Sequence, residues 1–75
     1  MIFDTLRDTL AKQFDIDPES ITEDTNLVDD IGADSLDIVE LIMTLEDTYN
    51  IHISDDDIAS LTTVKAISDY LEKLQ

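Results

Sequence analysis

The sequence predicts an all-α fold, a small antiparallel four-helix bundle of three main helices and one short helix, with a long loop between helices one and two. Three observations support this prediction. Apolar residues recur at helical intervals in three segments, the hydrophobic fraction is 43%, and no strand-like alternation of useful length occurs. A chain of 75 residues has room for one domain, which we expect to cover residues 1–75.

The first helix is predicted from about Ile2 to Phe14. Its apolar stripe consists of Phe3, Leu6, Leu10 and Phe14. The polar residues expected to face water are Arg7, Asp8, Lys12 and Gln13. Pro18 ends the pattern, because proline disfavours a helical conformation at the residue before it. A long connection follows as far as Asp34. Five apolar residues are expected to pin it across the core: Ile16, Ile21, Leu27, Val28 and Ile31.

The second helix is predicted from Ser35 to about Asn50. Gly32, the single glycine, precedes it, and no Gly or Pro interrupts it. Its core stripe consists of Ile38, Leu41, Ile42, Leu45 and Tyr49. The region from Ser35 onward is therefore expected to pack as a regular helix against the other two main helices.

Two further helices are predicted after the second. The Ser54 hydroxyl, three residues ahead of Asp57, is expected to cap a short third helix through Ile58 to about Leu61. Either residue of the pair 62–63 can cap the fourth helix, because both are threonines. The apolar stripe of that helix is Val64, Ile67, Leu71 and Leu74, with Tyr70 at its edge.

A second apolar stripe on the second helix points away from the predicted core. At about 100° per residue, Leu36, Val39 and Met43 lie nearly opposite the core stripe. Acidic residues border them: Glu40, Glu46 and Asp47. An apolar strip with a charged border is typical of a docking surface, because the centre supplies burial and the border steers the partner. The alternative is that the rest of the bundle covers this stripe as part of the core.

The charge balance excludes one class of function. Nineteen acidic residues against four basic ones give a formal net charge of −15. Nucleic-acid binding requires a basic surface and is excluded, whereas basic protein partners are attracted. The absence of cysteine removes disulfides, Cys-based metal sites and a thiol nucleophile. The sequence contains neither a basic leader nor a long apolar run, so we expect no membrane insertion and a cytoplasmic location.

Ser35 is the candidate modification site. It lies at or near the start of the second helix, where backbone N–H groups and the helix dipole favour an anion such as a phosphate ester. The alternative is an ordinary N-cap serine. The single histidine, His52, follows the far end of this helix, about 24 Å away at a rise of about 1.5 Å per residue. We therefore expect His52 to be a surface loop residue, no catalytic residue in the chain, and activation of Ser35 by another enzyme.

Two acidic runs are candidate metal sites. Residues 15–19 begin like a calcium-binding loop, but Ser20 stands where glycine is required and Asn26 where the bidentate glutamate belongs. Residues 55–57 form a second run, and clustered acids of this kind are typical of a solvated face. We expect no specific metal site, with weak and non-specific cation binding at most.

The serine and the apolar stripe meet in one segment, Gly32-Ala33-Asp34-Ser35-Leu36-Asp37-Ile38-Val39-Glu40-Leu41. This segment resembles the attachment motif of the acyl carrier proteins of dissociated, type II fatty acid synthesis. The resemblance extends along the chain, including residues 27–30 and 62–64. It implies a single acyl-carrier domain whose cofactor, 4'-phosphopantetheine, is covalently attached to Ser35. The thiol of that arm would hold growing acyl chains as thioesters.

The resemblance also implies partners. A phosphopantetheinyl transferase, the holo-carrier-protein synthase, would use coenzyme A as donor, and fatty acid synthesis and acyltransferase enzymes would bring basic docking patches. The residues assigned to transferase and partner docking are Asp34, Leu36, Asp37, Val39, Glu40, Met43, Glu46, Asp47, Asp55, Asp56 and Asp57. The chain would act as a monomeric substrate and shuttle, not as an enzyme. The family shelters the acyl chain inside the bundle, and Ile38 replaces a more usual small or polar residue, which leaves the preferred chain length open.

Two alternative functions remain at this point. A carrier of another cargo, such as polyketide, aminoacyl or D-alanyl groups, would share the serine and much of the acidic surface. The run from Asp37 to Leu41 favours fatty acid synthesis over these cargoes. An unmodified acidic binding module would use the charge without using Ser35.

Overall fold

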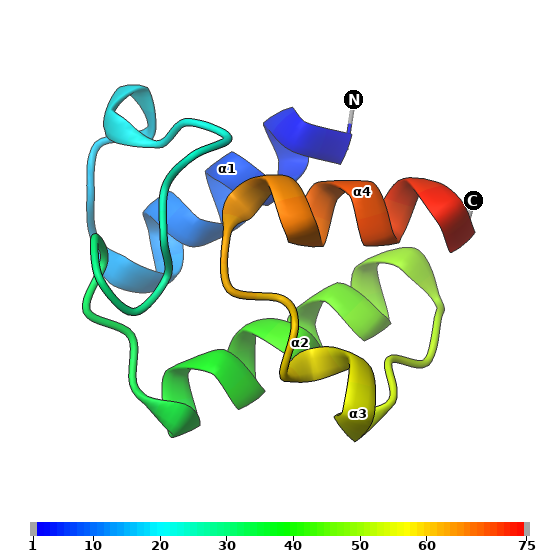
Figure 1. Ribbon diagram of the computed structural model, residues 1–75. Coiled ribbons are helices and arrows are strands. Elements are labelled where there is room, and N and C mark those ends of the chain that lie inside the picture. The colour runs from blue at the N-terminus through cyan, green and yellow to red at the C-terminus, as the bar shows by residue number, and fades with distance from the viewer. Residues whose placement is uncertain (1, 75) are drawn as a thin grey trace.

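The computed structural model describes residues 2–74, which contain four α-helices and one short 3₁₀ helix joined by loops (Figure 1). The elements are α1 (Ile2–Phe14), η1 (Pro18–Ser20), α2 (Ser35–Tyr49), α3 (Asp55–Ile58) and α4 (Val64–Leu74). Within this described range no strand forms, although Asn26 and Thr63 make an isolated antiparallel bridge. The predicted all-α fold is confirmed. Met1 and Gln75 lie outside the described residues. The single domain expected over residues 1–75 can therefore be compared with the structure only for residues 2–74.

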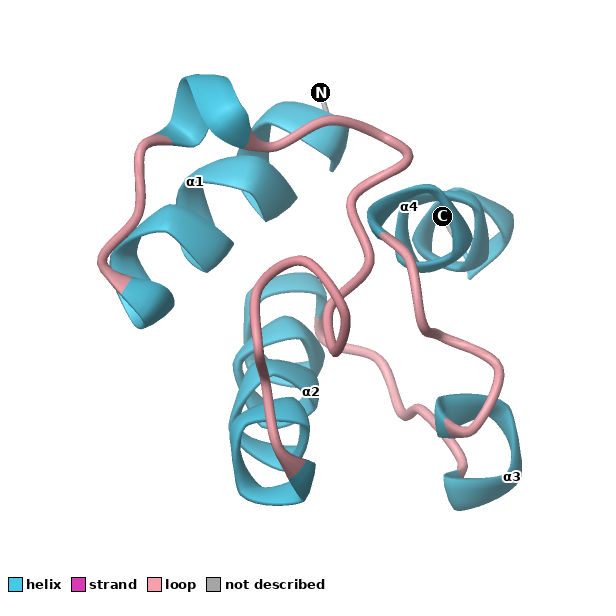
Figure 2. Ribbon diagram, turned by 60° about the vertical axis from the view of Figure 1, so that its left-hand side comes forward, coloured by secondary structure: helices cyan, strands magenta, loops and turns pink. Residues whose placement is uncertain are grey.

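The three long helices surround a common centre. In Figure 1, α1 and α4 run in opposite directions, with α2 below them and α3 beside α2. Figure 2 looks almost along α4 and shows α2 standing across it. The long connection passes over α1 in that view and then descends along α2 to its first residue. This route places Ser35 at one end of the molecule.

The core is one cluster of buried apolar side chains from α1, α2, α4 and the loops. Its most deeply buried members are Leu6, Leu10, Leu27, Leu41, Leu45, Val64, Ile67 and Leu71. The predicted stripes of the three long helices therefore face the core. Leu74 is the exception, because it is the last residue of α4 and leaves nearly half of its surface exposed.

Two polar residues of α1 do not simply face water as expected. Arg7 is partly buried, and its guanidinium lies 5.9 Å from the centre of the Phe3 ring. Gln13 donates a hydrogen bond of 2.9 Å from Nε2 to the carbonyl oxygen of Asp37. Long side chains bury their stems along apolar surface while their polar ends find partners. Gln13 thereby ties the end of α1 to the first turn of α2.

The long connection is pinned both by side chains and by its backbone. Ile21 and Leu27 are buried, and Ile16 and Ile31 pack partly buried against the core. Three backbone hydrogen bonds join it to the chain around the start of α4: Leu27 N to Thr62 O at 2.9 Å, Val64 N to Thr25 O at 3.0 Å, and Lys65 N to Glu23 O at 2.9 Å. Val28 was expected to help, but this was wrong. Its side chain is 51% exposed.

The helix ends differ slightly from the predicted ones. α2 ends at Tyr49, because Asn50 adopts the left-handed conformation with φ 53° and caps it. α3 ends at Ile58, short of the predicted Leu61, because the following backbone bonds connect residues three apart and close turns. Thr63, rather than its neighbour, caps α4 by accepting a 3.1 Å bond from a backbone N–H of the first turn.

Candidate functional site

Ser35 is the first residue of α2, and its side chain is exposed. Asp34 is the N-cap, since its Oδ1 accepts a 3.0 Å bond from the backbone N–H of Asp37. Asp37 Oδ2 in return accepts a 3.2 Å bond from the backbone N–H of Asp34. The alternative in which Ser35 caps the helix is therefore wrong. Within residues 2–74 no hydrogen bond engages the Ser35 hydroxyl, so this oxygen is free to react.

The backbone before Ser35 turns sharply. Gly32 has a φ of +81°, which other residues rarely adopt, and its N–H bonds to the carbonyl oxygen of Val28 at 3.1 Å. Ala33 is buried immediately afterwards and donates to the carbonyl oxygen of Leu27 at 2.9 Å. These bonds fix the turn from which Asp34 and Ser35 emerge at the surface.

The N-terminus of α2 suits a negatively charged group at Ser35. The first N–H groups of an α-helix have no acceptor within the helix, and the helix dipole places partial positive charge there. Asp34 satisfies the N–H of Asp37, while the N–H groups of Ser35 and Leu36 have no intrahelical acceptor. A phosphate ester on Ser35 would lie close to these donors.

An apolar cleft of about 280 Å³ opens beside Ser35, between α2 and α3. The residues that line it are Val28, Ser35, Ile38, Val39, Ile58, Ala59, Leu61 and Thr62. Val28, which does not pin the loop, thus contributes to the wall of this cleft. The sequence did not reveal the cleft, because its walls come from three separate segments. An apolar hollow directly beside the free hydroxyl fits a lipid-like group tethered there.

The outward stripe of α2 lies on the surface. Leu36 is 76% exposed and Met43 59%, while Val39 is about half exposed. The alternative in which the bundle covers these residues is therefore wrong. Glu40 and Asp47 are exposed along the same helix. The structure thus brings these five residues to one accessible face, and their role in docking stays a prediction.

Glu46 has a structural partner that the sequence did not reveal. Its Oε2 accepts a 2.8 Å bond from the backbone N–H of Ile53 and lies 3.4 Å from Nδ1 of His52. Glu46 thereby anchors the loop between α2 and α3. The His52 side chain is 89% exposed in this loop, as predicted for a surface residue.

The three acids that open α3 have different environments. Asp55 and Asp56 are exposed, whereas Asp57 is partly buried and accepts a 2.7 Å bond from the hydroxyl of Tyr70. This bond and, to a smaller extent, the nearby hydroxyl of Ser54 lower the pKa of Asp57. The same bond to Asp57 raises the pKa of Tyr70, because it favours the protonated phenol. Asp57 therefore joins α3 to α4.

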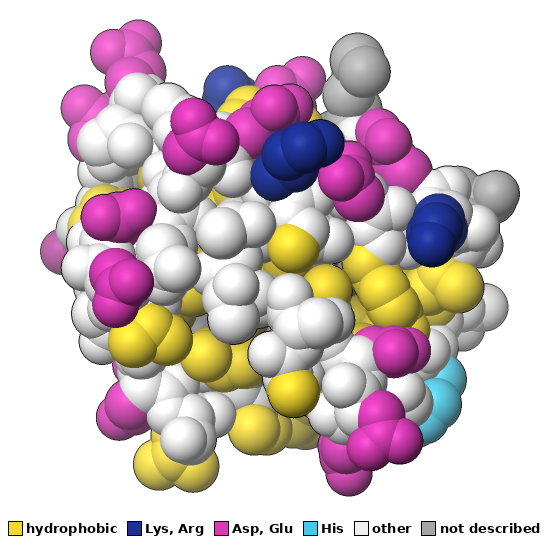
Figure 3. All heavy atoms as spheres, viewed as in Figure 1, with side chains coloured by type: hydrophobic (Ala, Val, Ile, Leu, Met, Phe, Trp, Pro, Cys, Tyr) yellow, Lys and Arg dark blue, Asp and Glu magenta, His cyan; other side chains and the backbone are white. Residues whose placement is uncertain are grey.

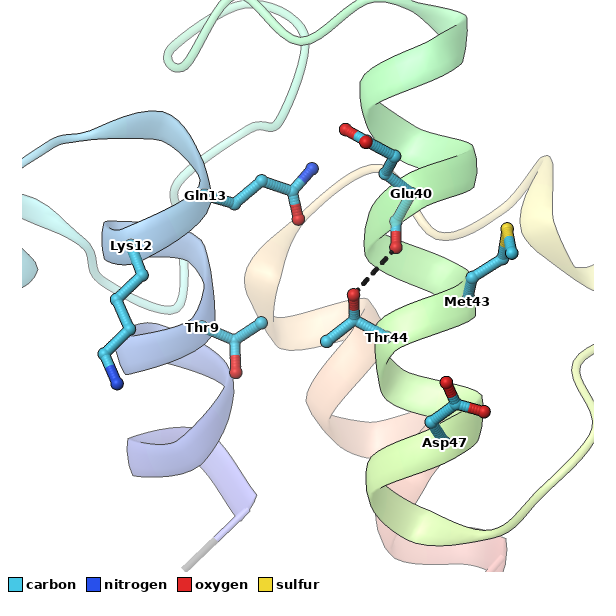
Figure 4. A pocket seen from close by; sticks show the side chains of 7 residues that line it. All are labelled: Thr9, Lys12, Gln13, Glu40, Met43, Thr44 and Asp47. Carbon is cyan, nitrogen blue, oxygen red and sulfur yellow. Dashed lines mark hydrogen bonds between the residues drawn. The ribbon is translucent and has the colours of Figure 1, made fainter.

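A groove of about 580 Å³ runs between α1 and α2 (Figure 4). Its lining residues are Thr9, Lys12, Gln13, Glu40, Met43, Thr44 and Asp47. The hydroxyls of Thr9 and Thr44 donate to the carbonyl oxygens four residues earlier on their own helices. Figure 4 shows Lys12 on the α1 side and Asp47 on the α2 side of this groove. Met43 also lines a second hollow with Asp55 and Ile58, so the outward stripe adjoins both α1 and α3.

One face of the molecule combines acidic side chains with exposed apolar areas. On the face drawn in Figure 3, acidic side chains surround exposed apolar areas, and basic side chains are few. Within residues 2–74, no three His, Cys, Asp or Glu side chains are grouped so that they could hold a metal ion. No described helix is both long enough and apolar enough to cross a membrane.

Comparisons with known proteins agree with this geometry. The family model described as a phosphopantetheine attachment site matches residues 4–71. An acyl carrier protein from Syntrophobacter fumaroxidans is 53% identical over 66 residues, which cover 88% of this chain and 82% of that one. A solved acyl carrier protein from Enterococcus faecalis superposes with a TM-score of 0.86 at 31% identity, covering 99% of this chain and 94% of the other. A second solved structure, described as that of an acyl carrier protein from Mycobacterium tuberculosis, superposes with a TM-score of 0.93 at 31% identity and covers both chains in full.

Proposed function

The chain belongs to the acyl carrier proteins, and we propose that Ser35 is the residue to which its phosphopantetheine arm is attached. One observation carries this proposal. Ser35 presents an exposed hydroxyl, without a hydrogen-bonding partner among the described residues, directly beside an apolar cleft. The neighbouring carboxylates of Asp34 and Asp37 accept hydrogen bonds from each other's backbone N–H groups, so the Ser35 hydroxyl is not needed as a helix cap.

The residues around Ser35 are suited to the phosphodiester of the arm. In the transfer, the Ser35 oxygen loses its proton and forms a bond to phosphorus, while the adenosine bisphosphate portion of coenzyme A leaves. The partial positive charge at the start of α2 and the N–H groups of Ser35 and Leu36 favour the negative charge of the diester. The attached arm supplies a terminal thiol that holds acyl groups as thioesters.

The cleft beside Ser35 is the proposed shelter for the acyl chain. Its walls are formed almost entirely by apolar side chains, which favour the removal of a hydrocarbon chain from water. Ile38 and Ile58 contribute from α2 and α3, respectively. Because Ile38 is bulky and borders this space, it is the residue to vary when chain-length preference is measured.

The exposed face of α2 is the proposed docking surface for the phosphopantetheinyl transferase and for fatty acid synthesis enzymes. Leu36, Val39 and Met43 would supply apolar contact. The exposed acids Glu40 and Asp47, with those that open α3, would meet basic patches on the partner. The remaining acids of the predicted docking set also have structural contacts: Asp34, Asp37, Glu46 and Asp57.

The chain is a carrier, and we further propose that it has no catalytic activity of its own and acts as one monomeric domain. We also propose a cytoplasmic location, as one compartment in which coenzyme A, the proposed donor of the arm, is available. Fatty acyl groups are the proposed cargo, because the run from Asp37 to Leu41 resembles carriers of dissociated fatty acid synthesis. Polyketide, aminoacyl or D-alanyl groups are the alternative cargoes.

Intact mass tests the proposal directly. The chain is co-expressed with a phosphopantetheinyl transferase of broad specificity, and its mass is compared with that of the Ser35→Ala variant. We expect the wild type to gain the mass of one phosphopantetheine and Ser35→Ala to gain none. Ser20→Ala is the matched control, because Ser20 is also exposed and its hydroxyl bonds only to a nearby backbone carbonyl. A wild-type chain that stays unmodified refutes the assignment, as does a modified Ser35→Ala chain.

A further inference from the structure

The third helix is held in place by few contacts. α3 has four residues, and none of them is buried. Ile58 packs partly buried against the core, and Ser54 caps the first turn by accepting from the N–H of Asp57 at 3.3 Å. So short a helix has little stability of its own, because the nucleation of a helix is costly and each added residue returns one hydrogen bond. Its position therefore depends on its side-chain contacts.

One of these contacts reaches across to α4. The hydroxyl of Tyr70 donates a 2.7 Å hydrogen bond to Oδ2 of Asp57, thirteen residues away in sequence. Hydrogen bonds to a carboxylate are shorter and stronger than those between neutral groups. The Tyr70 ring packs against the core cluster, so the donor belongs to the well-packed part of the molecule. The bond therefore fixes the weakly held α3 to a helix that is firmly held.

The same short helix forms one wall of the cleft beside Ser35. Ile58 and Ala59 line the cleft from the α3 side, facing Ile38 and Val39 of α2. Asp57 directly precedes Ile58 in the chain. A movement of this wall away from α2 would carry Asp57 with it and stretch the bond to Tyr70.

We propose that the Tyr70–Asp57 hydrogen bond is a latch that holds the α3 wall of the Ser35 cleft and sets the cost of widening it. The significance of the latch rests on the proposed function, since an acyl chain too large for about 280 Å³ requires the wall to move. Tyr70 and Asp57 act through Ile58 and Ala59 and are positioning residues. Because coupling is reciprocal, a chain that widens the cleft also weakens the bond.

The first test uses the full-length protein without its arm. Amide hydrogen exchange is measured at Ile58, Ser60 and Leu61, whose N–H groups are hydrogen-bonded in and after α3. Tyr70→Phe removes the donor and keeps the ring. We expect about three- to tenfold faster exchange at these amides, as for the loss of one hydrogen bond, with no change in the middle of α2. Tyr49→Phe removes the same atom from a hydroxyl without a partner among the described residues, and it should not accelerate α3.

Variants at Asp57 sharpen this test. Asp57→Asn retains an acceptor oxygen and should accelerate α3 exchange less than Asp57→Ala does. The double variant Tyr70→Phe/Asp57→Ala should exchange no faster than Asp57→Ala alone, because the bond can be lost only once. Unchanged α3 exchange in Tyr70→Phe overturns the latch. Equal acceleration in α2, α3 and α4 also overturns it, because the hydroxyl would then support the whole fold.

The second test uses the chain loaded with acyl thioesters of different length. Thioester cleavage by hydroxylamine is measured for a short and a long acyl chain in the wild type and in Tyr70→Phe. We expect slower cleavage of the long-chain thioester in Tyr70→Phe, because the cleft widens at lower cost, and equal rates for the short chain. Equal long-chain rates in the two proteins contradict the latch. If Ser35 is not the attachment site, no thioester forms on it, whereas the exchange experiment still decides whether the latch exists.

Discussion

Asp34 and Asp37 accept hydrogen bonds from each other's backbone N–H across the first turn of α2, at 3.0 and 3.2 Å, and the exposed Ser35 lies between them in sequence. Both carboxylates lie at the positive end of the helix dipole, where negative charge is stabilising. This reciprocal pair supplies the capping that Ser35 could otherwise provide. The serine is thus held in a fixed position while its own oxygen stays free.

The capping role of Asp34 can be separated from its charge. Asp34→Ala should lower the free energy of unfolding by about 1 kcal/mol, because the N-cap acceptor is lost. Asp34→Asn should preserve stability, since asparagine caps equally well, but it should be loaded more slowly if the transferase requires the carboxylate. Urea unfolding and the loading rate measure the two effects. Equal stability of Asp34→Ala and the wild type would show that the cap contributes nothing.

The outward stripe of α2 should tolerate charge in the free protein. Both Val39→Asp and Met43→Asp are expected to stay folded. Met43→Asp should change the free energy of unfolding by about 0.5 kcal/mol or less, because Met43 is exposed, whereas Val39→Asp should cost somewhat more, because Val39 is half exposed and lines the cleft. Both variants should bind the transferase more weakly, since a charge would be buried at the interface. Leu45→Ala is the contrast, expected to cost about 2–5 kcal/mol at a fully buried position. Circular dichroism and a binding titration check both expectations, and unfolding of the Val39 or Met43 variant contradicts them.

Glu40 should act mainly on the rate of association. Glu40→Lys reverses an exposed charge beside the stripe and should slow binding to a basic partner at low salt. The difference from wild type should shrink as salt rises, because exposed charges are screened. Glu19→Lys makes the same change on exposed η1, away from α2, and is the control. Stopped-flow association at two ionic strengths measures the effect. An equally large loss at high salt would assign Glu40 a different role.

The hydroxyl of Tyr49 should be dispensable. It is buried without a hydrogen-bonding partner among residues 2–74, near the end of α2. An unpaired buried polar group is costly, so Tyr49→Phe should leave stability unchanged or raise it by about 1 kcal/mol. Thermal unfolding of the two proteins measures this change. A clear loss of stability would mean that the hydroxyl has a partner in solution.

The Tyr70–Asp57 bond predicts a specific pH dependence of stability. The pKa of Asp57 is lowered in the folded state by its bond from Tyr70 and by the nearby hydroxyl of Ser54. Its contribution should therefore be present above the ordinary aspartate pKa of about 3.9 and be lost as the pH falls through the lower, folded value. The pKa of Tyr70 is raised, so its contribution should be present below about pH 10 and be lost as the pH rises through the folded value.

Tyr70→Phe tests this dependence. The difference in the free energy of unfolding between wild type and Tyr70→Phe should be greatest between these two limits and should diminish in acid and in alkali. Urea unfolding at pH 3, 7 and 11 gives the comparison. A difference that is the same at all three values would show that ionisation of the pair does not affect stability.

The helices were predictable from the sequence because each long helix buries one clear stripe. The N-cap was not, since Asp34 and Ser35 are both good capping residues and adjacent positions cannot be distinguished by pattern. Val28 and Leu74 were placed wrongly for a related reason. An apolar residue in a loop or at a helix end has no periodicity to show whether it is covered.

The contacts between segments were also beyond sequence reasoning. Tyr70 could be placed at the edge of its helix, but its bond to Asp57 depends on how α3 lies against α4. The same holds for Glu46 and the backbone of Ile53. Such pairs join residues whose proximity is decided by the packing of helices and not by any local pattern. The candidate serine itself was found because its signal, a turn followed by an uninterrupted helix, is local.

Val39 belongs both to the outward stripe of α2 and to the lining of the cleft beside Ser35. An enzyme that docked on the outward stripe at this residue, as proposed, would also contact the edge of the cleft. Under the proposed function, partner recognition and access to the cleft would therefore depend on the same side chain, and a substitution that changes its size would alter both.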